Sequence, residues 1–350
     1  MIQEFSIGNF KIGKESPVFI IAELSANHNG SLDNALETIK AAKRVGADAI
    51  KLQTYTADTI TIDAKTDDFR LKQGTIWDGK YLYDLYKEAY TPWEWHEKLY
   101  KAAEDEGLIC FSSPFDKTAV DLLESLNTPA YKIASFEITD IPLIEYVASK
   151  GKPVIISTGI AEIEDIQLAV DACRNQGNDN IALLKCTSSY PAPIEEANML
   201  MVKDLSERFK VISGLSDHTM GISAPIVATS LGAKIIEKHF ILDRAIGGPD
   251  ASFSLNEEEF SALVKSVREA EKALGEINYN LTDKQKKGRE FSRSLYIVND
   301  VKVGDVLSED NVKSIRPGYG MHPKHYREVI GKKFIHNLPK GTALKWEMIN

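Results

Sequence analysis

The chain alternates between short apolar runs and longer amphipathic stretches. The apolar runs are rich in Ile and Val, which is typical of parallel strands buried on both faces. Between them lie helical patterns such as SLDNALETIKAAKRVG and DKTAVDLLESLN, several of which end near the Gly that commonly follows a helix. The runs are VFIIAELSA (18–26), DAIKLQTY (48–55), LICFSSPF (108–115), AYKIASFE (130–137), PVIISTG (153–159), IALLKCTS (181–188), VISGLSDH (211–218) and AKIIEKHF (233–240). Eight strand–helix pairs within roughly 250 residues predict an α/β fold, the (β/α)8 TIM barrel.

The pattern changes after Gly275. The stretch EINYNLTDKQKKGREFSRS is polar and charged, which indicates a linker. Beyond it, short strand-like pieces are separated by the turns VGD, RPG and PKG. A segment of about sixty residues buries so small a core that we expect it to dock onto something larger. The predicted organisation is a barrel domain over residues 1–275, a linker over 276–288 and a small β-rich domain over 289–350.

One long interruption, residues 56–90, separates the second predicted strand from its helix. It contains GTIWDGKYLYDLYKEAY, which is rich in aromatic residues. These side chains can cover the mouth of the barrel and meet a ligand, or they can simply pack the insertion onto the barrel. The sequence leaves both interpretations open.

Polar residues collect at the carboxyl ends of the predicted strands, where the active sites of TIM barrels lie. In chain order they are Glu23, Lys51, Gln53, Ser112, Ser113, Lys132, Ser135, Glu137, Ser157, Thr158, Thr187, Ser188 and Tyr190. Ammonium and hydroxyl groups that converge on one mouth are what a phosphate and a carboxylate require. We therefore expect the mouth to bind an anionic ligand.

Lys51 is the most informative of these residues. It shares a strand face with Gln53, while Ile50 and Leu52 point the other way, toward the helices. A Lys side chain directed into a barrel is costly unless an anion offsets its charge. That anion is either a ligand or the carboxylate of Glu23.

Two histidines end the seventh and eighth predicted strands. His218 shares a strand face with Ser216, and His239 shares one with Glu237. Because the two strands are neighbours, both imidazoles can reach one ion. Two neutral histidines without a Cys partner suit a divalent metal that keeps open positions for water and a substrate oxygen. The alternative is a pair of hydrogen-bonded histidines without metal.

Composition restricts the choice of partners and compartment. The chain has 42 basic and 51 acidic residues, a formal charge of −9, and no Lys/Arg cluster, which argues against nucleic acid or an anionic membrane as a partner. It has neither an apolar signal-peptide core at the start nor an apolar run of the roughly 18 residues that a membrane span needs. The three cysteines are far apart and form no CxxC motif. We expect reduced, mostly buried cysteines and a cytoplasmic protein.

Longer motifs point to a family. FIIAELSANHNG, GADAIKLQTY, PAYKIASFE, ISTG, CTSSYPAP, GLSDHT, EKHF and GGPDASFS follow one another along the predicted barrel, and SIRPGYG lies in the tail. With them the chain resembles the sialic acid synthase family of phosphoenolpyruvate-dependent nonulosonate synthases over nearly its whole length. The tail resembles the small antifreeze-like (SAF) domain of that family. The resemblance therefore implies a TIM barrel followed by a SAF domain.

The resemblance also implies roles for the residues of the mouth. His218 and His239 would bind a Mn²⁺ or Mg²⁺ ion that also takes the aldehyde oxygen of an open-chain N-acetylated amino sugar. Glu23 and Glu137 would handle protons or the attacking water. Arg316, in the tail, would reach an N-acetyl group of the sugar in the partner subunit of a domain-swapped homodimer. The residues implied for phosphoenolpyruvate are Lys51, Ser113, Lys132, Ser135, Ser157, Ser188 and Ser216, and those implied for the sugar are Gln53, Tyr190 and Asp250.

Within the family, ELSANHNG and KLQTYT resemble the branch that makes pseudaminic acid, whereas the neuraminate and legionaminate branches more often read EIGxNHNG and KFQTF. Ser188 stands where the neuraminate synthases usually carry Asn, and Lys185 where they often carry His. The implied reaction joins phosphoenolpyruvate to 2,4-diacetamido-2,4,6-trideoxy-L-altrose, giving a nine-carbon 2-keto sugar acid and phosphate. Synthesis of neuraminate or legionaminate is the alternative within the family.

Two further classes compete with a synthase. A metal-dependent aldolase would make the same carbon–carbon bond from pyruvate, reversibly and without phosphate. A non-catalytic protein that binds carbohydrate or ice would fit the antifreeze-like tail, but it has no need for paired histidines in a polar barrel mouth. The release of phosphate in step with product separates the synthase from both.

Overall fold

The chain divides into two compact units, Met1–Gly275 and Glu276–Asn350, in a computed structural model that describes residues 2–72 and 74–350. The stretch that the sequence indicates as a linker, residues 276–288, falls in the second unit and contains helix α11 (Asp283–Gly288). The cap of α11 explains why this polar stretch is helical, because the Thr282 hydroxyl accepts a hydrogen bond from the Gln285 backbone N–H.

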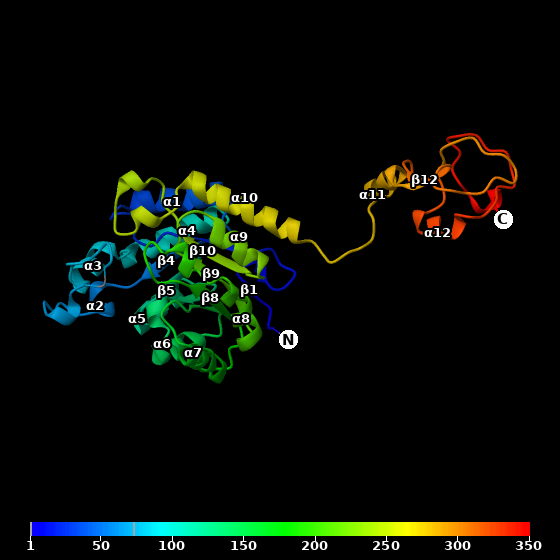
Figure 1. Cartoon of the computed structure of the whole chain (residues 1–350). Coiled ribbons are helices and arrows are strands. Elements are labelled where there is room, and N and C mark those ends of the chain that lie inside the picture. Colours follow the sequence, from blue (N-terminus) through cyan, green and yellow to red (C-terminus); the bar gives the residue numbers. More distant parts are fainter. Residues whose placement is uncertain (1, 73) are drawn as a thin grey trace. The chain divides into compact units, whose positions relative to one another are not determined.

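The first unit is a closed barrel of eight parallel strands, which confirms the predicted TIM barrel (Figure 1). Around the barrel the strands run in the order β10-β3-β4-β5-β6-β7-β8-β9, and each predicted apolar run contains one of them. The strands are β3 (Phe19–Glu23), β4 (Ala49–Thr54), β5 (Ile109–Pro114), β6 (Tyr131–Ile133), β7 (Val154–Ser157), β8 (Ile181–Cys186), β9 (Ile212–Asp217) and β10 (Ile235–His239). They are shorter than the predicted runs, because each run also includes the start of the loop that follows.

A helix follows every strand of the barrel. In chain order these helices are α1 (Leu32–Arg44), α4 (His96–Asp105), α5 (Lys117–Ser125), α6 (Ile141–Ala148), α7 (Ile163–Asn175), α8 (Leu200–Phe209), α9 (Ser223–Ser230) and α10 (Glu257–Leu274). Their ends carry local signals. The Ser31 side chain caps the start of α1 by accepting a hydrogen bond from Asn34 N, and Asn256 with Glu259 forms a capping box at the start of α10.

Strand alternation separates two kinds of core. Outward-facing residues such as Ile20 and Ile50 pack against the helices, whereas Phe19, Phe111 and Ile235 fill the interior. The hairpin of β1 (Phe5–Ile7) and β2 (Phe10–Ile12) packs against the same interior cluster. The amino-terminal half of the barrel is therefore apolar and closed, which leaves its carboxyl end for polar residues.

The insertion at 56–90 carries two short helices, α2 (Ala57–Ile60) and α3 (Leu82–Ala89). They lie next to the barrel on the side of β4 and β5 (Figure 1). Among the described residues, no helix is long and apolar enough to cross a membrane.

The second unit has a small core of its own around β11 (Ser294–Ile297) and β12 (Val312–Ile315), which pair as antiparallel strands. Leu295, Ile297, Phe334 and Leu344 are among its buried residues. One further short helix, α12 (Tyr326–Val329), packs Tyr326 and Val329 against this core. The predicted short β-rich domain is thus present.

Candidate active site

A ring of polar side chains lines the interior of the barrel at the carboxyl ends of its strands. We call it the polar layer; its members are Glu23, Lys51, Gln53, Ser113, Lys132, Ser157, Cys186, Ser216, Glu237 and His239. The strand register places several members side by side: Glu23 pairs with Lys51 and with His239, and Ser216 pairs with Cys186 and Glu237. All of these residues except Gln53 are buried.

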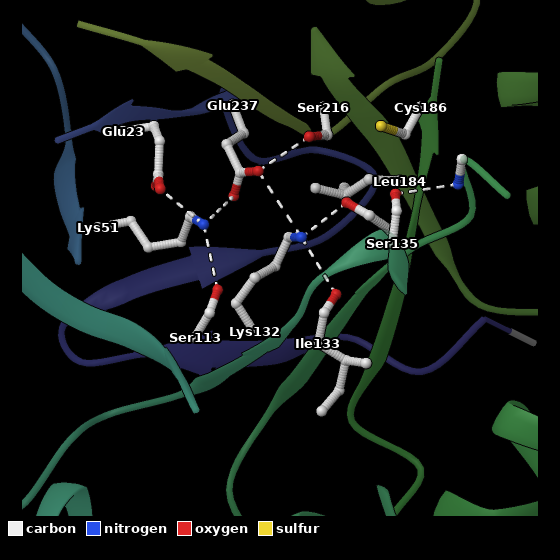
Figure 2. Close-up of polar contacts among 12 residues, drawn as sticks. Glu23, Lys51, Ser113, Lys132, Ile133, Ser135, Leu184, Cys186, Ser216 and Glu237 are labelled. Atoms are coloured by element: carbon white, nitrogen blue, oxygen red, sulfur yellow. Dashed lines mark hydrogen bonds and ion pairs between the residues drawn. The ribbon is translucent and has the colours of Figure 1, made fainter. Parts of the chain in front are cut away.

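Lys51 contacts two carboxylates (Figure 2). Its Nζ lies 2.8 Å from Glu23 Oε2 and 3.6 Å from Glu237 Oε2, and it donates to the Ser113 hydroxyl at 3.2 Å. Burial opposes the charge on Lys51, but the two carboxylates outweigh it and raise the lysine pKa. The ion pair with Glu23, one of the two alternatives from the sequence, is thus present.

Lys132 approaches the same carboxylate from the other side. Its Nζ lies 3.7 Å from Glu237 Oε1, and it donates to the Ser157 hydroxyl at 2.6 Å and to the Ile133 carbonyl at 3.1 Å. Burial lowers the pKa of Lys132. Figure 2 shows Glu237 between the two ammonium groups, where it also accepts from the Ser216 hydroxyl at 2.9 Å. The Glu237 carboxylate thus lies between two ammonium groups. An incoming anion would have to take the place of this carboxylate or share the two ammonium groups with it.

A glycine lets two predicted serines converge beside Lys132. A Cβ at Gly159 would lie 2.2 Å from the Ser188 hydroxyl oxygen and 2.7 Å from that of Ser135, so a side chain here would displace both hydroxyls. The Gly159 N–H donates to Ser135 Oγ at 3.1 Å. Two hydroxyls and a backbone N–H near a buried ammonium form a set of donors for an anion.

The two predicted histidines lie side by side, with ring centroids 5.3 Å apart. His218 Nδ1 is 3.0 Å from the Thr187 carbonyl and 3.7 Å from Cys186 Sγ. His239 Nδ1 is buried without a hydrogen-bond partner among the described residues; Asp250 Oδ2 is 3.8 Å away. Burial, with the nearby His218 and Lys51, holds the pKa of His239 well below its usual value. His239 is therefore neutral and has a nitrogen free to bind.

An ion pair on the opposite face of the same strands fixes both histidines. Lys238 Nζ contacts Asp217 Oδ2, and both side chains are 1% exposed. Lys238 also donates to the Thr219 carbonyl at 2.6 Å, while Asp217 Oδ1 accepts from Thr219 N at 2.9 Å. Since Asp217 and Lys238 directly precede His218 and His239, this pair holds the two histidine backbones in register.

The residues predicted to face the sugar are connected by hydrogen bonds and a ring contact near Glu23 and the histidines. Gln53 Nε2 donates to Glu23 Oε1 at 3.0 Å and to Ser25 Oγ at 2.9 Å, and Ser25 in turn donates to Asp250 Oδ2 at 2.5 Å. The Tyr190 ring lies 4.4 Å from the ring of His218. The structure thus brings Gln53, Tyr190 and Asp250 together beside the histidine pair.

Two predicted catalytic residues lie outside the polar layer. Glu137 belongs to the 3-10 helix η3 (Ser135–Glu137) after β6, and its Oε2 is buried without a hydrogen-bond partner in the described part of the chain. Burial raises the pKa of Glu137 to about 7, as it does for Glu23. Arg316 follows β12 in the second unit and is exposed.

Several residues of the site were not among those predicted from the sequence. Glu237 is the most central of them. It lies two residues before His239 on the same strand, so strand alternation could have predicted that it faces the interior of the barrel. Cys186 is free and buried, as predicted for all three cysteines, but it lies within the polar layer. Phe253 and Trp77 add aromatic rings near Tyr190, with centroids 5.3 and 5.5 Å from it, and Trp77 belongs to the aromatic insertion for which the sequence left two interpretations open. No periodicity in the sequence links an insertion to a loop more than a hundred residues later.

The described residues contain no group of three or more His, Cys, Asp and Glu side chains that could hold a metal ion. The two predicted histidines are thus a pair of candidate ligand residues, with the Asp250 carboxylate 3.8 Å from His239 Nδ1. That arrangement differs from a closed structural site, which takes all its ligands from the chain.

The chain is similar to known proteins over nearly its whole length. The chain is 49% identical to the pseudaminic acid synthase of Campylobacter jejuni (strain 81-176), covering 97% of this chain and 98% of that protein. It is 48% identical to the pseudaminic acid synthase of Helicobacter pylori, covering 94% and 96%. The structure of an N-acetylneuraminic acid synthetase from Leptospira borgpetersenii in complex with citrate superposes with a TM-score of 0.73 at 32% identity, covering 82% of this chain and 95% of that one.

Two family models match the chain. The SAF domain model covers residues 292–350, which confirms the predicted antifreeze-like tail. The NeuB family model covers residues 38–279, more than half of the chain. Together with relatives that align over nearly their full length, this match confirms the resemblance found in the motifs: the chain belongs to the NeuB family.

Proposed function

We propose that this protein is a pseudaminic acid synthase, which condenses phosphoenolpyruvate with 2,4-diacetamido-2,4,6-trideoxy-L-altrose to give pseudaminic acid and phosphate. The observation that carries the proposal is the pairing of two buried ammonium groups, Lys51 and Lys132, with two neighbouring histidines in one barrel mouth. The first feature suits a small, highly charged anion and the second suits an aldehyde that needs activation. The near-full-length relatives named pseudaminic acid synthase support the choice of sugar.

Phosphoenolpyruvate would bind at the cationic side of the mouth. Lys51 and Lys132 supply charge, and the hydroxyl groups of Ser113, Ser135, Ser157, Ser188 and Ser216 supply donors around them. The Gly159 N–H lies beside Ser135 and Ser188, so one anionic group of the substrate can replace their present contacts. The other anionic group would face Lys51, where Glu23 and Glu237 now balance the charge.

The histidine pair fits a divalent metal, and we propose Mn²⁺ or Mg²⁺. The fit rests on the buried Nδ1 of His239, which lacks a hydrogen-bond partner in the described chain, and on its low pKa. His218 and His239 would hold the ion, with the Asp250 carboxylate nearby. When bound, such an ion polarises the aldehyde of the sugar as a Lewis acid.

The residues of the mouth then divide the remaining steps. With the aldehyde polarised, C3 of phosphoenolpyruvate attacks the aldehyde carbon and positive charge develops at C2. Water adds to C2 and loses a proton to Glu23 or Glu137, whose pKa values near 7 suit a base at neutral pH. The hemiketal phosphate so formed breaks the bond between C2 and the phosphate oxygen as the C2 hydroxyl loses its proton. Phosphate leaves, the former aldehyde oxygen has taken up a proton as a hydroxyl group, and the 2-keto acid remains.

We further propose that the enzyme is a domain-swapped homodimer in the cytoplasm. Arg316 would reach an N-acetyl group of sugar bound in the partner's barrel, and its exposed planar fork suits an amide oxygen. The resemblance to the family supports this arrangement. The three free, buried cysteines agree with a reducing compartment.

Release of phosphate tests the proposed function directly. The protein would be incubated with phosphoenolpyruvate, Mn²⁺ and each of three sugars: N-acetylmannosamine, 2,4-diacetamido-2,4,6-trideoxymannose and its L-altrose isomer. We expect the L-altrose sugar to react well and N-acetylmannosamine to react more slowly by orders of magnitude, because polar groups meant for a second acetamido group stay unpaired. Equal specificity constants for these two would favour neuraminate synthesis, and product without phosphate would indicate an aldolase.

A further inference from the structure

We propose that Trp77 is a specificity-determining residue: its indole ring, with the ring of Phe253, forms an apolar wall that selects a deoxy amino sugar over one with hydroxyl groups at the same positions. The proposal deepens the proposed function and rests on it, because it concerns the sugar half of the same mouth.

Trp77 lies one aromatic ring away from each histidine. Its ring centroid is 5.5 Å from that of Tyr190, which is 4.4 Å from His218. On the other branch, Trp77 is 6.5 Å from Phe253, which is 5.0 Å from His239. Two chains of rings thus run from the insertion to the pair of imidazoles. Edge-on and offset arrangements at these distances are the favoured ones for aromatic side chains.

The orientation of Trp77 is fixed from both ends. Its Nε1 donates to the Pro249 carbonyl at 3.1 Å, so the polar atom of the indole is already used and the ring offers a ligand apolar surface. Its backbone belongs to a tight turn in which Asp78 accepts from Gly74 N and Thr75 N at 2.8 and 3.0 Å. The ring is only partly buried, whereas Phe253 is 2% exposed.

The rings of the wall come from segments that carry neither buried lysine. Lys51 and Lys132 lie on β4 and β6, whereas Tyr190 and Phe253 lie in the loops after β8 and β10. The rings pack on the histidines themselves, since Tyr190 lies against His218 and Phe253 against His239. If the aldehyde is activated at the histidines and phosphoenolpyruvate binds the lysines, the rest of the sugar extends toward the rings.

The chemistry of the proposed sugar matches such a wall. The trideoxy sugar has a methyl group at C6 and an acetyl methyl on each of two nitrogens, whereas N-acetylmannosamine has hydroxyl groups at C4 and C6. An aromatic surface gains from contact with methyl groups, and it desolvates a hydroxyl without giving it a partner. Replacing a methyl contact by an unpaired hydroxyl group in an apolar site changes the specificity constant by about 10- to 200-fold.

The test compares Trp77→Ala with Trp77→Phe, and with Ile76→Ala as a control in the same turn. Ile76 is 53% exposed, so truncating its side chain alters the same turn but leaves the rings of Trp77 and Phe253 in place. For each variant, kcat and KM are measured with the L-altrose sugar and with N-acetylmannosamine at saturating phosphoenolpyruvate, and KM is measured for phosphoenolpyruvate. We expect Trp77→Ala to lower kcat/KM for the trideoxy sugar by about 10- to 200-fold. The same variant should change kcat/KM for N-acetylmannosamine and KM for phosphoenolpyruvate by less than about threefold. Trp77→Phe should restore most of the loss, and Ile76→Ala should behave as wild type.

Fluorescence gives a readout of binding that does not depend on turnover. Trp77 is one of four tryptophans, so titration with the trideoxy sugar should change the emission of the wild type and not that of Trp77→Phe. An unchanged ratio of specificity constants in Trp77→Ala, or an equal loss for both sugars, would show that Trp77 only packs the insertion. That result overturns this inference alone, whereas a wild type that releases no phosphate with any of the sugars overturns the proposed function and this inference with it.

Discussion

Lys51 and Glu23 form an ion pair inside the barrel, with 2.8 Å between Nζ and Oε2 and side chains that are 4% and 2% exposed. Glu237 adds a second carboxylate at 3.6 Å from the same Nζ. The charge of the ammonium group is thus balanced by carboxylates of the protein itself. Such a pair can serve stability, or it can keep a cation ready for an anionic substrate, and the two roles predict different effects of mutation.

Replacing Lys51 by Ala should raise KM for phosphoenolpyruvate far more than KM for the sugar. An ammonium lost from a desolvated anion site removes roughly 1.5 to 3 kcal/mol, which corresponds to one to two orders of magnitude in KM. Steady-state kinetics with each substrate varied in turn measures the split. Lys40→Ala, on the surface of α1, is the matched control.

A purely structural pair gives a different result. Removing one partner of a buried pair costs about 3 to 5 kcal/mol in the free energy of unfolding, because the other charge stays buried without compensation. If Lys51→Ala lost stability of this size while both KM values of the remaining folded enzyme were unchanged, Lys51 would have no role in binding. A change in the KM of the sugar alone would assign Lys51 to the other half of the site.

Removing either histidine should abolish activity and leave the fold intact. We expect His218→Ala and His239→Ala to lose binding of Mn²⁺, measured by calorimetry on chelator-treated protein, because two protein ligands cannot be reduced to one without losing most of the affinity. His336→Ala, which removes an exposed histidine of the second unit, should bind as wild type. Full activity of either barrel variant in chelator-containing buffer would rule out the metal site.

The fold could be predicted almost completely because its signal is local and repeated. Each of the eight apolar runs is buried on both faces, and the caps at Ser31 and Asn256 begin helices where the amphipathic pattern begins. The site was predictable to the extent that strand alternation governs it. Lys51, Lys132, His218 and His239 follow from counting residues along a strand, since one face of each strand points inward.

The rest of the site depends on contacts between distant segments. Trp77 reaches the Pro249 carbonyl across 172 positions, and Lys238 contacts Asp217 on the outer face, where alternation predicts apolar packing. Glu237 faces inward as alternation requires, but its place between Lys51 and Lys132 depends on how three strands meet across the barrel. Such contacts are set by packing, and periodicity carries no information about them.

The contribution of the buried Glu137 carboxyl to stability should fall as pH rises through neutrality. Burial raises the pKa of Glu137 from 4.5 to about 7, so the folded state binds a proton more tightly than the unfolded state between these values. The stabilisation is therefore complete below about pH 4.5 and lost as pH rises through 7, with up to roughly 3 kcal/mol from this one group. Glu137→Gln should show a smaller fall than the wild type in chemical unfolding of the ligand-free protein at pH 5 and pH 8.

The pKa of Glu23 is also raised to about 7, so Glu23 should keep part of the pH dependence of stability in Glu137→Gln. Glu258→Gln, on the exposed face of α10, controls for the loss of a surface carboxylate. An equal change in stability between pH 5 and pH 8 in Glu137→Gln and in the wild type would contradict the assignment of Glu137 as a buried acid with a raised pKa.

Two inactive variants should complement each other if the active sites are shared between chains. Arg316→Ala alters the second unit and His239→Ala alters the barrel, so a mixed dimer with swapped tails contains one mouth in which both residues are intact. After subunit exchange, verified by an affinity tag on one partner, we expect phosphate release to recover to as much as about one quarter of the wild-type rate, since half of the dimers are mixed and half of their mouths are intact. A lid from a partner is useful chemically, because an open mouth would admit bulk water to the cation that develops at C2. No recovery in verified mixed dimers would show that each tail serves its own barrel or none, and Arg316 would then have no role in trans.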